Sequence, residues 1–382
     1  MKRLKTGGRE IRLHNRSRIL EYVYMRGQTT KQQLVEALDM SLPTVIQNVK
    51  ELLSEGLFRE TGQLQSTGGR KATAVAPIPC LKVAVGADVT RSDLGLVLVD
   101  LTGSILLHRR IACPFEPVPA YYERVGQLIL AFIRDAEHLP GGGIPREAVL
   151  GVGFSIPGII DQSGEEIVYS HALDIRNVPC ERFRAPLSGL PCVFLNDASA
   201  GCFAEARGLE EPAFVYLSLN FCVGGAIFLN GQLYPGVHQH SGEFGHMRLV
   251  PGGKRCYCGQ IGCIDAYCAA VRLSALAGGS LYEFFRLVHE GDPACQSAFD
   301  EYLDWLALAV TNLSMAYDCE VVVGGSVGSF LDEYLPELRR RASPLNTFEQ
   351  NGEYLRVCRH HLEASALGAA LQHVDAFFQS FQ

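Results

Sequence analysis

Three cysteines stand within eight residues of this chain, in the stretch KRCYCGQIGC at positions 254–263. Cys256, Cys258 and Cys263 follow the spacing C-x-C-x4-C, and Gly259 and Gly262 allow the loop to turn back on itself. Thiolates at this spacing suit three corners of a tetrahedral zinc site, which needs one further ligand. The histidines just upstream that could provide it are His238, His240 and His246. Four protein ligands leave no open position, so we expect one structural Zn²⁺ per chain rather than a hydrolytic metal.

The alternative interpretation of this cluster is three buried free thiols. The chain has 13 cysteines, an odd number, and most stand in apolar segments such as PCVFL and YDCEVVV. A free thiol in such a segment acts as a small hydrophobe, so a disulfide framework is not expected. Cysteines as close together as these, in a reducing compartment, more often hold metal than remain free, which favours the zinc site.

Size and composition bound the fold class. A chain of 382 residues predicts two or three domains, and 47% hydrophobic with 20% charged residues is typical of globular proteins with a buried core. No apolar run reaches the roughly 18 residues that a membrane span needs, and MKRLKTGGRE is not followed by an apolar leader segment. We therefore expect a cytoplasmic protein with no membrane partner.

Charge is unevenly distributed along the chain. Residues 1–75 hold 13 basic and 7 acidic side chains, a net charge of +6. Because the whole chain has a net charge of −7, the remaining 307 residues have a net charge of −13. A basic front segment favours a polyanion such as nucleic acid, whereas an acidic body disfavours one. The two parts are expected to have different partners.

The basic segment predicts a helix-turn-helix. Apolar residues recur at helical spacing in three short runs, around Ile19–Val23, Leu34–Leu38 and Val45–Leu53. Thr30 and Ser41 can cap the second and third helices, and Pro43 is tolerated in the opening turn of the third. The tight connection between these two helices would send the start of the third into a DNA major groove. The side chains expected to meet the DNA there are Ser41, Thr44, Gln47 and Asn48.

A β-wing is predicted directly after these helices. The stretch RETGQLQSTGGRKATAVAPI forms two extended runs around a glycine-rich tip, and Arg70 and Lys71 at that tip could enter a narrow minor groove. Residues 1–78 are therefore predicted to be a winged helix-turn-helix domain that binds double-stranded operator DNA. The alternative is a helical interaction domain whose charges are only solvated.

The remainder of the chain alternates strands and helices, which predicts an α/β body. Strand-like runs include LKVAVGADV and AFVYLSLNFCVGGAIFLNGQLYPG, with a hairpin signal at Asn230–Gly231. Helical periodicity marks AYYERVGQLILAFIRDAEHL and YLDWLALAVTNLSMAYD. The prolines of APIPC indicate a boundary near residue 78.

Several motifs of this body resemble the ROK family of sugar kinases and sugar-responsive repressors. They are GVGFSIPGIID, NDAS at 196–199, NGQLYPG, GEFGHMRL and CYCGQIGC, in the family's order and near its spacing, and STGGRKAT resembles the repressor branch. The resemblance covers nearly the whole chain. It implies a two-lobed actin/hexokinase-like, ribonuclease H-like ATPase-type body, with lobes at 79–196 and 197–382 and a C-terminal helix that returns to the first lobe.

The resemblance also implies the roles of individual residues. His246 corresponds to the family's fourth zinc ligand, which gives a site of His246, Cys256, Cys258 and Cys263. The implied sugar-binding residues are Asn196, Asp197, Glu243, His246 and Asp265. Asp265 stands where many members have glutamate, so that match is partial. Asp197 corresponds to the general base of the kinases, although Asn196 and Asp197 could also serve only as a turn or helix cap.

The phosphate loops of the kinase branch are degenerate in this sequence. The first, aspartate-x-glycine-glycine-threonine in the kinases, is DVTR (88–91) here, and the second is NFCVGGA (220–226). Without the glycines, backbone N–H groups cannot approach phosphate closely, so no kinase activity is expected and Asp197 is a vestigial base.

We therefore predict a transcriptional regulator, a repressor of carbohydrate-utilisation genes, that responds to a sugar or sugar phosphate and forms a homodimer or homotetramer. The alternatives are an ATP-dependent sugar kinase with a DNA-binding extension, and a zinc-stabilised regulator controlled by a protein partner.

Overall fold

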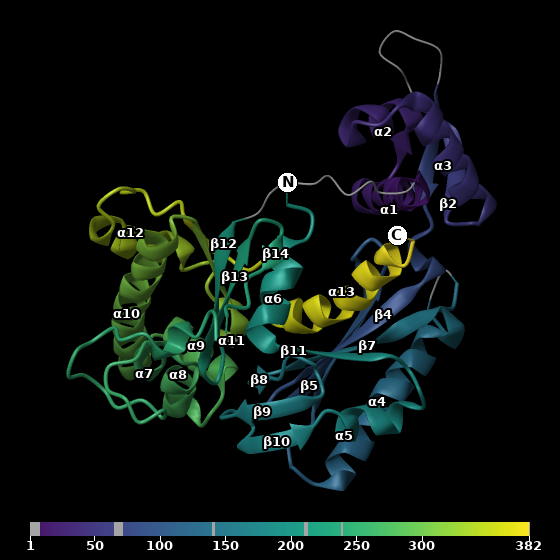
Figure 1. Cartoon of the computed structure of the whole chain (residues 1–382). Coiled ribbons are helices and arrows are strands. Elements are labelled where there is room, and N and C mark those ends of the chain that lie inside the picture. Colours follow the sequence, from purple (N-terminus) through teal and green to yellow (C-terminus); the bar gives the residue numbers. More distant parts are fainter. Residues whose placement is uncertain (1–7, 65–71, 140–141, 210–212, 238–239, 382) are drawn as a thin grey trace.

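The computed structural model describes residues 8–64, 72–139, 142–209, 213–237 and 240–381. They form a small N-terminal domain and two α/β lobes (Figure 1). Among these residues, no helix is both long enough and apolar enough to traverse a bilayer.

The N-terminal domain is a winged helix-turn-helix. Its elements are α1 (Gly8–Arg26), β1 (Thr29–Thr30), α2 (Lys31–Leu38), α3 (Leu42–Ser54), β2 (Phe58–Leu64) and β3 (Ala72–Pro77), with the strands in the order β1-β3-β2. The predicted caps are confirmed: Thr30 forms a capping box with Gln33, and the Ser41 side chain accepts a hydrogen bond from the N–H of Thr44.

The first helix is longer than the apolar pattern predicted. It begins at Gly8, eleven positions before the first fully buried apolar residue, Ile19. The added turns are held by ion pairs instead of apolar packing: Arg12 contacts Glu51 of α3 at 2.6 Å, and Arg16 pairs with Glu55. The spacing of apolar residues therefore does not reveal the part of a helix that is held by charged contacts.

The first lobe contains a mixed five-stranded sheet in the order β6-β5-β4-β7-β11. Strands β4, β7 and β11 are parallel, while β5 and β6 add antiparallel to one side. Its elements are β4 (Val83–Val89), β5 (Asp93–Asp100), β6 (Ile105–Ala112), α4 (Pro119–Ala136), β7 (Val149–Ile156), α5 (Glu181–Arg184) and β11 (Cys192–Asn196). A separate small sheet holds β8 (Ile159–Ile160), β9 (Glu166–Ser170) and β10 (Ile175–Pro179).

The second lobe repeats this topology. Its sheet has the order β14-β13-β12-β15-β16, so both sheets show the sequential order three-two-one-four-five. Its strands are β12 (Phe214–Leu219), β13 (Val223–Leu229), β14 (Gln232–Leu233), β15 (Glu320–Gly324) and β16 (Leu355–Val357). Its helices are α6 (Asp197–Ala206), α7 (Asp265–Cys268), α8 (Val271–Ser274), α9 (Leu281–Glu290), α10 (Pro293–Tyr317), α11 (Gly325–Gly328) and α12 (Leu335–Ala342).

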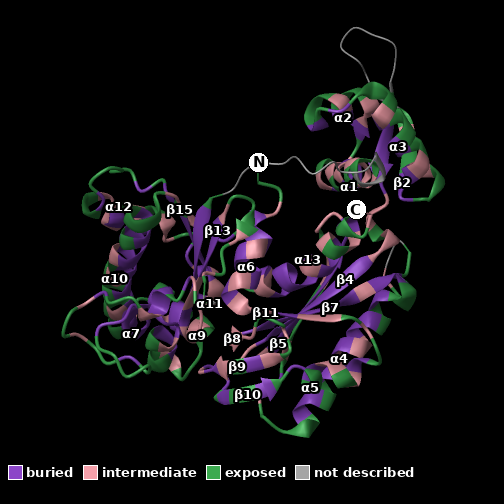
Figure 2. Ribbon diagram, viewed as in Figure 1, coloured by how far each residue is buried: buried purple, intermediate pink, exposed green. Residues whose placement is uncertain are grey.

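The last helix, α13 (Ala364–Gln379), connects the three parts of the molecule. It packs on β4, β5 and β7 of the first lobe, on α6, and on α1 of the winged domain. Figure 1 shows it in yellow, running from between the lobes to the winged domain, and Figure 2 shows that much of its surface is buried. One hydrophobic cluster extends from Ile19 and Tyr24 through Leu371 and Phe378 to Val97.

Glycine permits the close contact between α13 and its neighbours. A Cβ atom on Gly368 would lie 1.7 Å from the carbonyl oxygen of Ala200 in α6. A Cβ on Gly153 of β7 would lie 2.0 Å from the carbonyl oxygen of Ala369. Backbone atoms on both sides leave no flexible side chain that could move away, so a larger residue would push the helix off its seat.

We predict that Gly368→Ala lowers the free energy of unfolding by about 3 kcal/mol, because overpacking outweighs the better helix propensity of alanine. Denaturant unfolding followed by circular dichroism measures this change. Gly62→Ala is the control, since Gly62 is exposed and its added Cβ would meet nothing within 4 Å. Equal stability of the two variants would contradict the packing argument.

Candidate functional site

A cleft of about 1280 Å³ lies between the lobes and is lined by residues from both of them. The ends of strands β4, β7, β11, β12 and β13 meet there, as expected where two sheets of this topology face each other. Of the predicted sugar-binding residues, Asn196, Asp197, Glu243 and His246 line this cleft. They come from the start of α6 and from the segment that precedes the cysteine loop.

The pair Asn196 and Asp197 stands where β11 passes into α6. The Asn196 side chain caps the helix by accepting from the N–H of Ser199 at 3.0 Å, and its amide donates to the Gly158 carbonyl at 3.0 Å. The capping role considered from sequence is therefore present. Asp197 accepts at Oδ2 from the side-chain amide of Asn220, also at 3.0 Å. The carboxylate consequently faces the cleft in a fixed orientation.

Burial raises the pKa of Asp197 to about 6, against the opposing effect of the Asn220 hydrogen bond; the nearby Asp88 carboxylate raises it further. Asp88 is itself buried at the end of β4, where it accepts from the Ser155 hydroxyl at 2.9 Å, and burial raises its pKa as well. A carboxyl group that titrates close to neutral pH can exchange a proton or a hydrogen bond with a sugar hydroxyl.

The structure does not place Asp265 in the cleft lining, although the family resemblance implies that it binds sugar. Asp265 is only 4% exposed and is not among the described residues that line the cleft. Its Oδ2 accepts from the backbone N–H of Val223 at 2.7 Å, at the start of β13. The aspartate side chain therefore holds the start of β13. Burial raises the pKa of Asp265.

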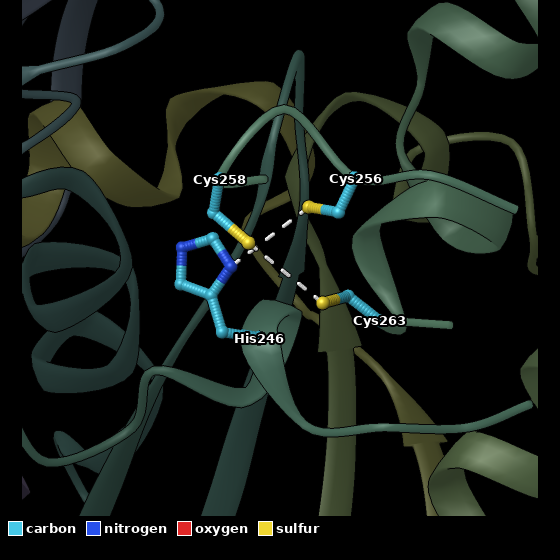
Figure 3. Close-up of side chains that lie close together, drawn as sticks. All are labelled: His246, Cys256, Cys258 and Cys263. Carbon is cyan, nitrogen blue, oxygen red and sulfur yellow. Dashed lines mark hydrogen bonds between the residues drawn. The ribbon is translucent and has the colours of Figure 1, made fainter. Parts of the chain in front are cut away.

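The four predicted metal ligands converge on one point (Figure 3). The ligand atoms of His246, Cys256, Cys258 and Cys263 all lie within 4.8 Å of one another. The Sγ atoms of Cys258 and Cys263 are 3.8 Å apart, and Nδ1 of His246 lies 4.0 Å from Sγ of Cys256. Tetrahedral zinc with 2.3 Å bonds places two sulfurs roughly 3.8 Å apart, so the donor set and its spacing fit Zn²⁺.

The upstream histidines are now distinguished. His240 is exposed and lines the cleft without joining the ligand cluster, and His238 lies outside the described residues. His246 is positioned by a short 3-10 turn, Phe244–His246, that packs on β13.

The backbone of the cysteine loop explains its glycines. The N–H of Cys256 donates to the carbonyl of Gln260 at 2.9 Å, which closes a tight turn between the first two cysteines and the third. Gly262 has a φ of +84°, and a Cβ there would lie 1.9 Å from the Val250 carbonyl oxygen. Only glycine fits this position, which brings Cys263 back toward Cys258.

The two turns that correspond to kinase phosphate loops are closed by their own side chains. In the β4–β5 turn, the Thr90 hydroxyl accepts from the N–H groups of Ser92 and Asp93, at 3.3 and 2.9 Å. In the second turn, the N–H of Asn220 donates to the carbonyl of Cys222 at 3.2 Å, and Oδ1 of Asn220 accepts from the N–H of Ser326, in α11, at 2.7 Å. These backbone donors are therefore occupied, and sequence comparison could not have revealed their partners.

Residues from both turns also meet across the cleft. The guanidinium of Arg91 lies over the ring of Phe221, 5.0 Å from its centroid. Phe221 in turn lies 6.4 Å from the ring of His171, and His171 stacks on Tyr257 at 3.7 Å. All four line the cleft, and neither His171 nor Tyr257 was expected at the site.

The predicted DNA-binding residues are only partly on the exposed face of α3. Ser41 and Gln47 are exposed and Thr44 is half-buried, although the Gln47 amide donates to Glu51 at 2.6 Å. The prediction that Asn48 faces outward is wrong: it is 3% exposed, and its amide donates to the carbonyl of Thr44. Arg70 and Lys71 lie outside the described residues.

Two apolar residues of α3 were missed. Leu42 and Ile46 are 44% and 45% exposed, and their spacing of four puts them on the same helix face. Val45 and Val49 already accounted for the buried apolar face of the helix, so Leu42 and Ile46 did not stand out in the sequence.

The chain is similar in sequence to a repressor and to a kinase. Over 317 residues the chain is 25% identical to a xylose repressor from Bacillus spizizenii, a match covering 81% of each. Over 251 residues it is 28% identical to an N-acetylmannosamine kinase from Escherichia fergusonii, covering 63% of this chain and 82% of the kinase.

Solved structures share the fold. A ROK-family transcriptional regulator, a homologue of the Escherichia coli MLC protein, superposes with a TM-score of 0.75 at 19% identity, over 97% of this chain and 98% of that one. A glucokinase from Streptomyces griseus, in complex with glucose and AMPPNP, gives 0.62 at 24% identity, over 76% of this chain and 98% of its own. The family model described as "ROK family" matches residues 84–375. This protein belongs to the ROK family.

Proposed function

We propose that this protein is a sugar-responsive transcriptional repressor that binds operator DNA through its winged domain and a sugar or sugar phosphate in the interlobe cleft. The observation that carries this proposal is the shared core of α13, which contacts the winged domain at one end and the cleft at the other. The similarity to a xylose repressor supports the same conclusion.

The cleft end of α13 is joined to the sugar-site pair. The hydroxyl of Ser365, in the first turn of the helix, donates to the backbone carbonyl of Asp197 at 3.0 Å. A shift of Asp197 or α6 on sugar binding would therefore be transmitted to α13 directly. The glycine-dependent seat of the helix favours movement as a rigid unit.

The opposite end of α13 is joined to the winged domain. The hydroxyl of Ser17 in α1 donates to the Phe378 carbonyl at 3.0 Å, and the rings of Tyr24 and Phe378 lie 5.4 Å apart. Tyr24 also donates to the carbonyl of Leu57, where α3 passes into the wing. A displacement of α13 would thus reorient the recognition helix and the wing together.

The proposed mechanism is a population shift in a homodimer or homotetramer. Sugar favours one closure of the lobes, which changes the spacing of two winged domains so that they no longer match operator half-sites. The coupling arises only from unequal sugar affinity for the two closures. The residues proposed to hold the sugar are Asn196, Asp197, Glu243 and His246.

The alternative of a sugar kinase has support from the kinase relatives and from the position of Asp197. Phosphoryl transfer depends on positioning and charge stabilisation of the transferred group. The occupied N–H donors of the two turns, Asp93 in the first and Asn220 in the second, and the Phe221 ring under Arg91 oppose ATP binding in the same place. We therefore propose that the chain has no kinase activity. Control by a protein partner remains the third alternative.

The test uses the full-length protein and an operator selected from random duplex DNA. We predict that one sugar from a panel including xylose, glucose and N-acetylmannosamine weakens operator binding roughly 5- to 150-fold in fluorescence anisotropy. Glu243→Ala should keep the operator affinity and lose the response, whereas Glu349→Ala, at an exposed position that does not line the cleft, should keep both.

Three outcomes would contradict this prediction in different ways. Rapid formation of sugar phosphate from radiolabelled ATP would favour the kinase. Calorimetric silence across the whole sugar panel would favour a protein partner as the signal. An unchanged sugar response in Glu243→Ala would show that the sugar binds in another pocket.

The four-residue cluster is proposed to hold a structural zinc ion, which ties His246 of the sugar site to the cysteine loop. We predict that Cys258→Ser loses about one equivalent of zinc and at least about 3 kcal/mol of stability, because zinc binding and folding of the loop are coupled. Elemental analysis and calorimetric unfolding measure both quantities. Cys80→Ser, an exposed cysteine outside the cluster, should change neither. Folded wild-type protein free of zinc would contradict the prediction.

The exposed pair Leu42 and Ile46 is proposed to contact thymine methyl groups in the major groove. We predict that replacing thymine by uracil in the operator weakens wild-type binding about fivefold, because the methyl contact is lost. Leu42→Ala/Ile46→Ala should bind both operators equally, and weakly. Leu345→Ala, equally exposed but in the second lobe, is the control. A uracil penalty that persists in the double variant would contradict this contact.

A further inference from the structure

Tyr257 makes two contacts in the cleft that the zinc and sugar roles do not require. Its hydroxyl lies 3.2 Å from Nε2 of His246. Its ring stacks on the His171 ring, with centroids 3.7 Å apart and planes at 3°. His171 follows β9 in the first lobe, whereas Tyr257 belongs to the cysteine loop of the second, so the stack crosses the cleft.

The contact with His246 occupies the nitrogen that a sugar would need. An imidazole has two ring nitrogens, and Nδ1 of His246 faces the sulfur of Cys256 at 4.0 Å. Only Nε2 is left for a ligand in the cleft, and Tyr257 holds it. A sugar hydroxyl that bonds His246 must therefore displace the Tyr257 hydroxyl.

The tyrosine can move without its loop. Its backbone lies between Cys256 and Cys258, and the turn is closed by the Cys256 and Gly259 N–H groups. The residue is 38% exposed, so rotation of its side chain can withdraw the hydroxyl from His246. The same rotation would break the parallel stack on His171.

The stack belongs to a row of contacts between the lobes. Arg91 of the first lobe lies over Phe221 of the second, and Phe221 is 6.4 Å from His171. His171 thus lies beside aromatic rings from two separate loops of the second lobe. Loss of Tyr257 from this row would remove its closest stacked pair and weaken the hold between the lobes.

We propose that Tyr257 is a latch that the sugar displaces. In the sugar-free protein, its hydroxyl fills the place of a sugar hydroxyl on His246 and its ring holds the first lobe through His171. A sugar that takes Nε2 of His246 releases the stack and permits a different closure of the lobes. The inference rests on the proposed function, because it names the residue that converts sugar binding into lobe movement.

The first experiment compares sugar affinities by calorimetry, using the sugar that the panel identifies. Tyr257→Phe keeps the ring and removes the competing hydroxyl, so it should bind sugar roughly three- to tenfold more tightly than wild type. Tyr282→Phe, a 73% exposed tyrosine that does not line the cleft, should bind as wild type does. Weaker binding by Tyr257→Phe would overturn the latch, because the hydroxyl would then be a sugar ligand.

The second experiment needs no sugar. Small-angle X-ray scattering of the sugar-free protein should show a changed radius of gyration in Tyr257→Ala and His171→Ala, and no change in Tyr257→Phe, which retains the stack. Unchanged scattering in both alanine variants would overturn the latch even if the regulator function holds. Failure of wild type to bind any sugar would instead contradict the proposed function and, with it, displacement of the latch by sugar, whereas the scattering result would still decide whether the stack holds the lobes.

Discussion

The close packing of α13 against α6 and β7 is the constraint on which the arrangement of the molecule depends. Gly368 and Gly153 let the helix backbone approach α6 and β7 more closely than any side chain would allow. The helix then completes the first lobe's sheet packing and offers Tyr24 and Ile19 of the winged domain an apolar surface. Because one continuous core includes all three parts, the winged domain is not a freely tethered module. Its orientation follows that of α13.

The cysteine loop fixes the position of His246 in the cleft, just as the glycines fix the position of α13. Cys256 and Cys263 are almost fully buried in the second lobe's core, so the ligand cluster is continuous with that core. A metal on Nδ1 of His246 would fix the tautomer and direction of Nε2 toward the cleft. Sugar recognition at this nitrogen would then depend on a ring that the protein cannot reorient. Movement on binding is therefore expected in the partners of the ring, Tyr257 and His171.

The sequence predicted features that depend on local rules. Caps at Thr30 and Ser41 follow from residue type and spacing, and the clustering of His246 with the cysteines follows from motifs. Asn48 was misjudged because its position borders the apolar stripe, and a bond to the backbone carbonyl of Thr44 let its amide be buried. Asp265 and His171 act through residues over 40 positions away in the chain. No local pattern marks such partners, because the fold alone brings them together.

The departures from the kinase pattern also form contacts across the cleft. Arg91 stands where a loop glycine would be, and Phe221 replaces the opening of the second loop; together they form a contact across the cleft. Asn220 donates to the Asp197 carboxylate and accepts from the N–H of Ser326, so it joins that carboxylate to α11. In a kinase these loops must stay open to admit ATP. In the proposed repressor, the same positions become contacts between the parts that move. Under this proposal, the side chains that oppose ATP binding would also give the lobes a preferred closure, from which a sugar would shift them.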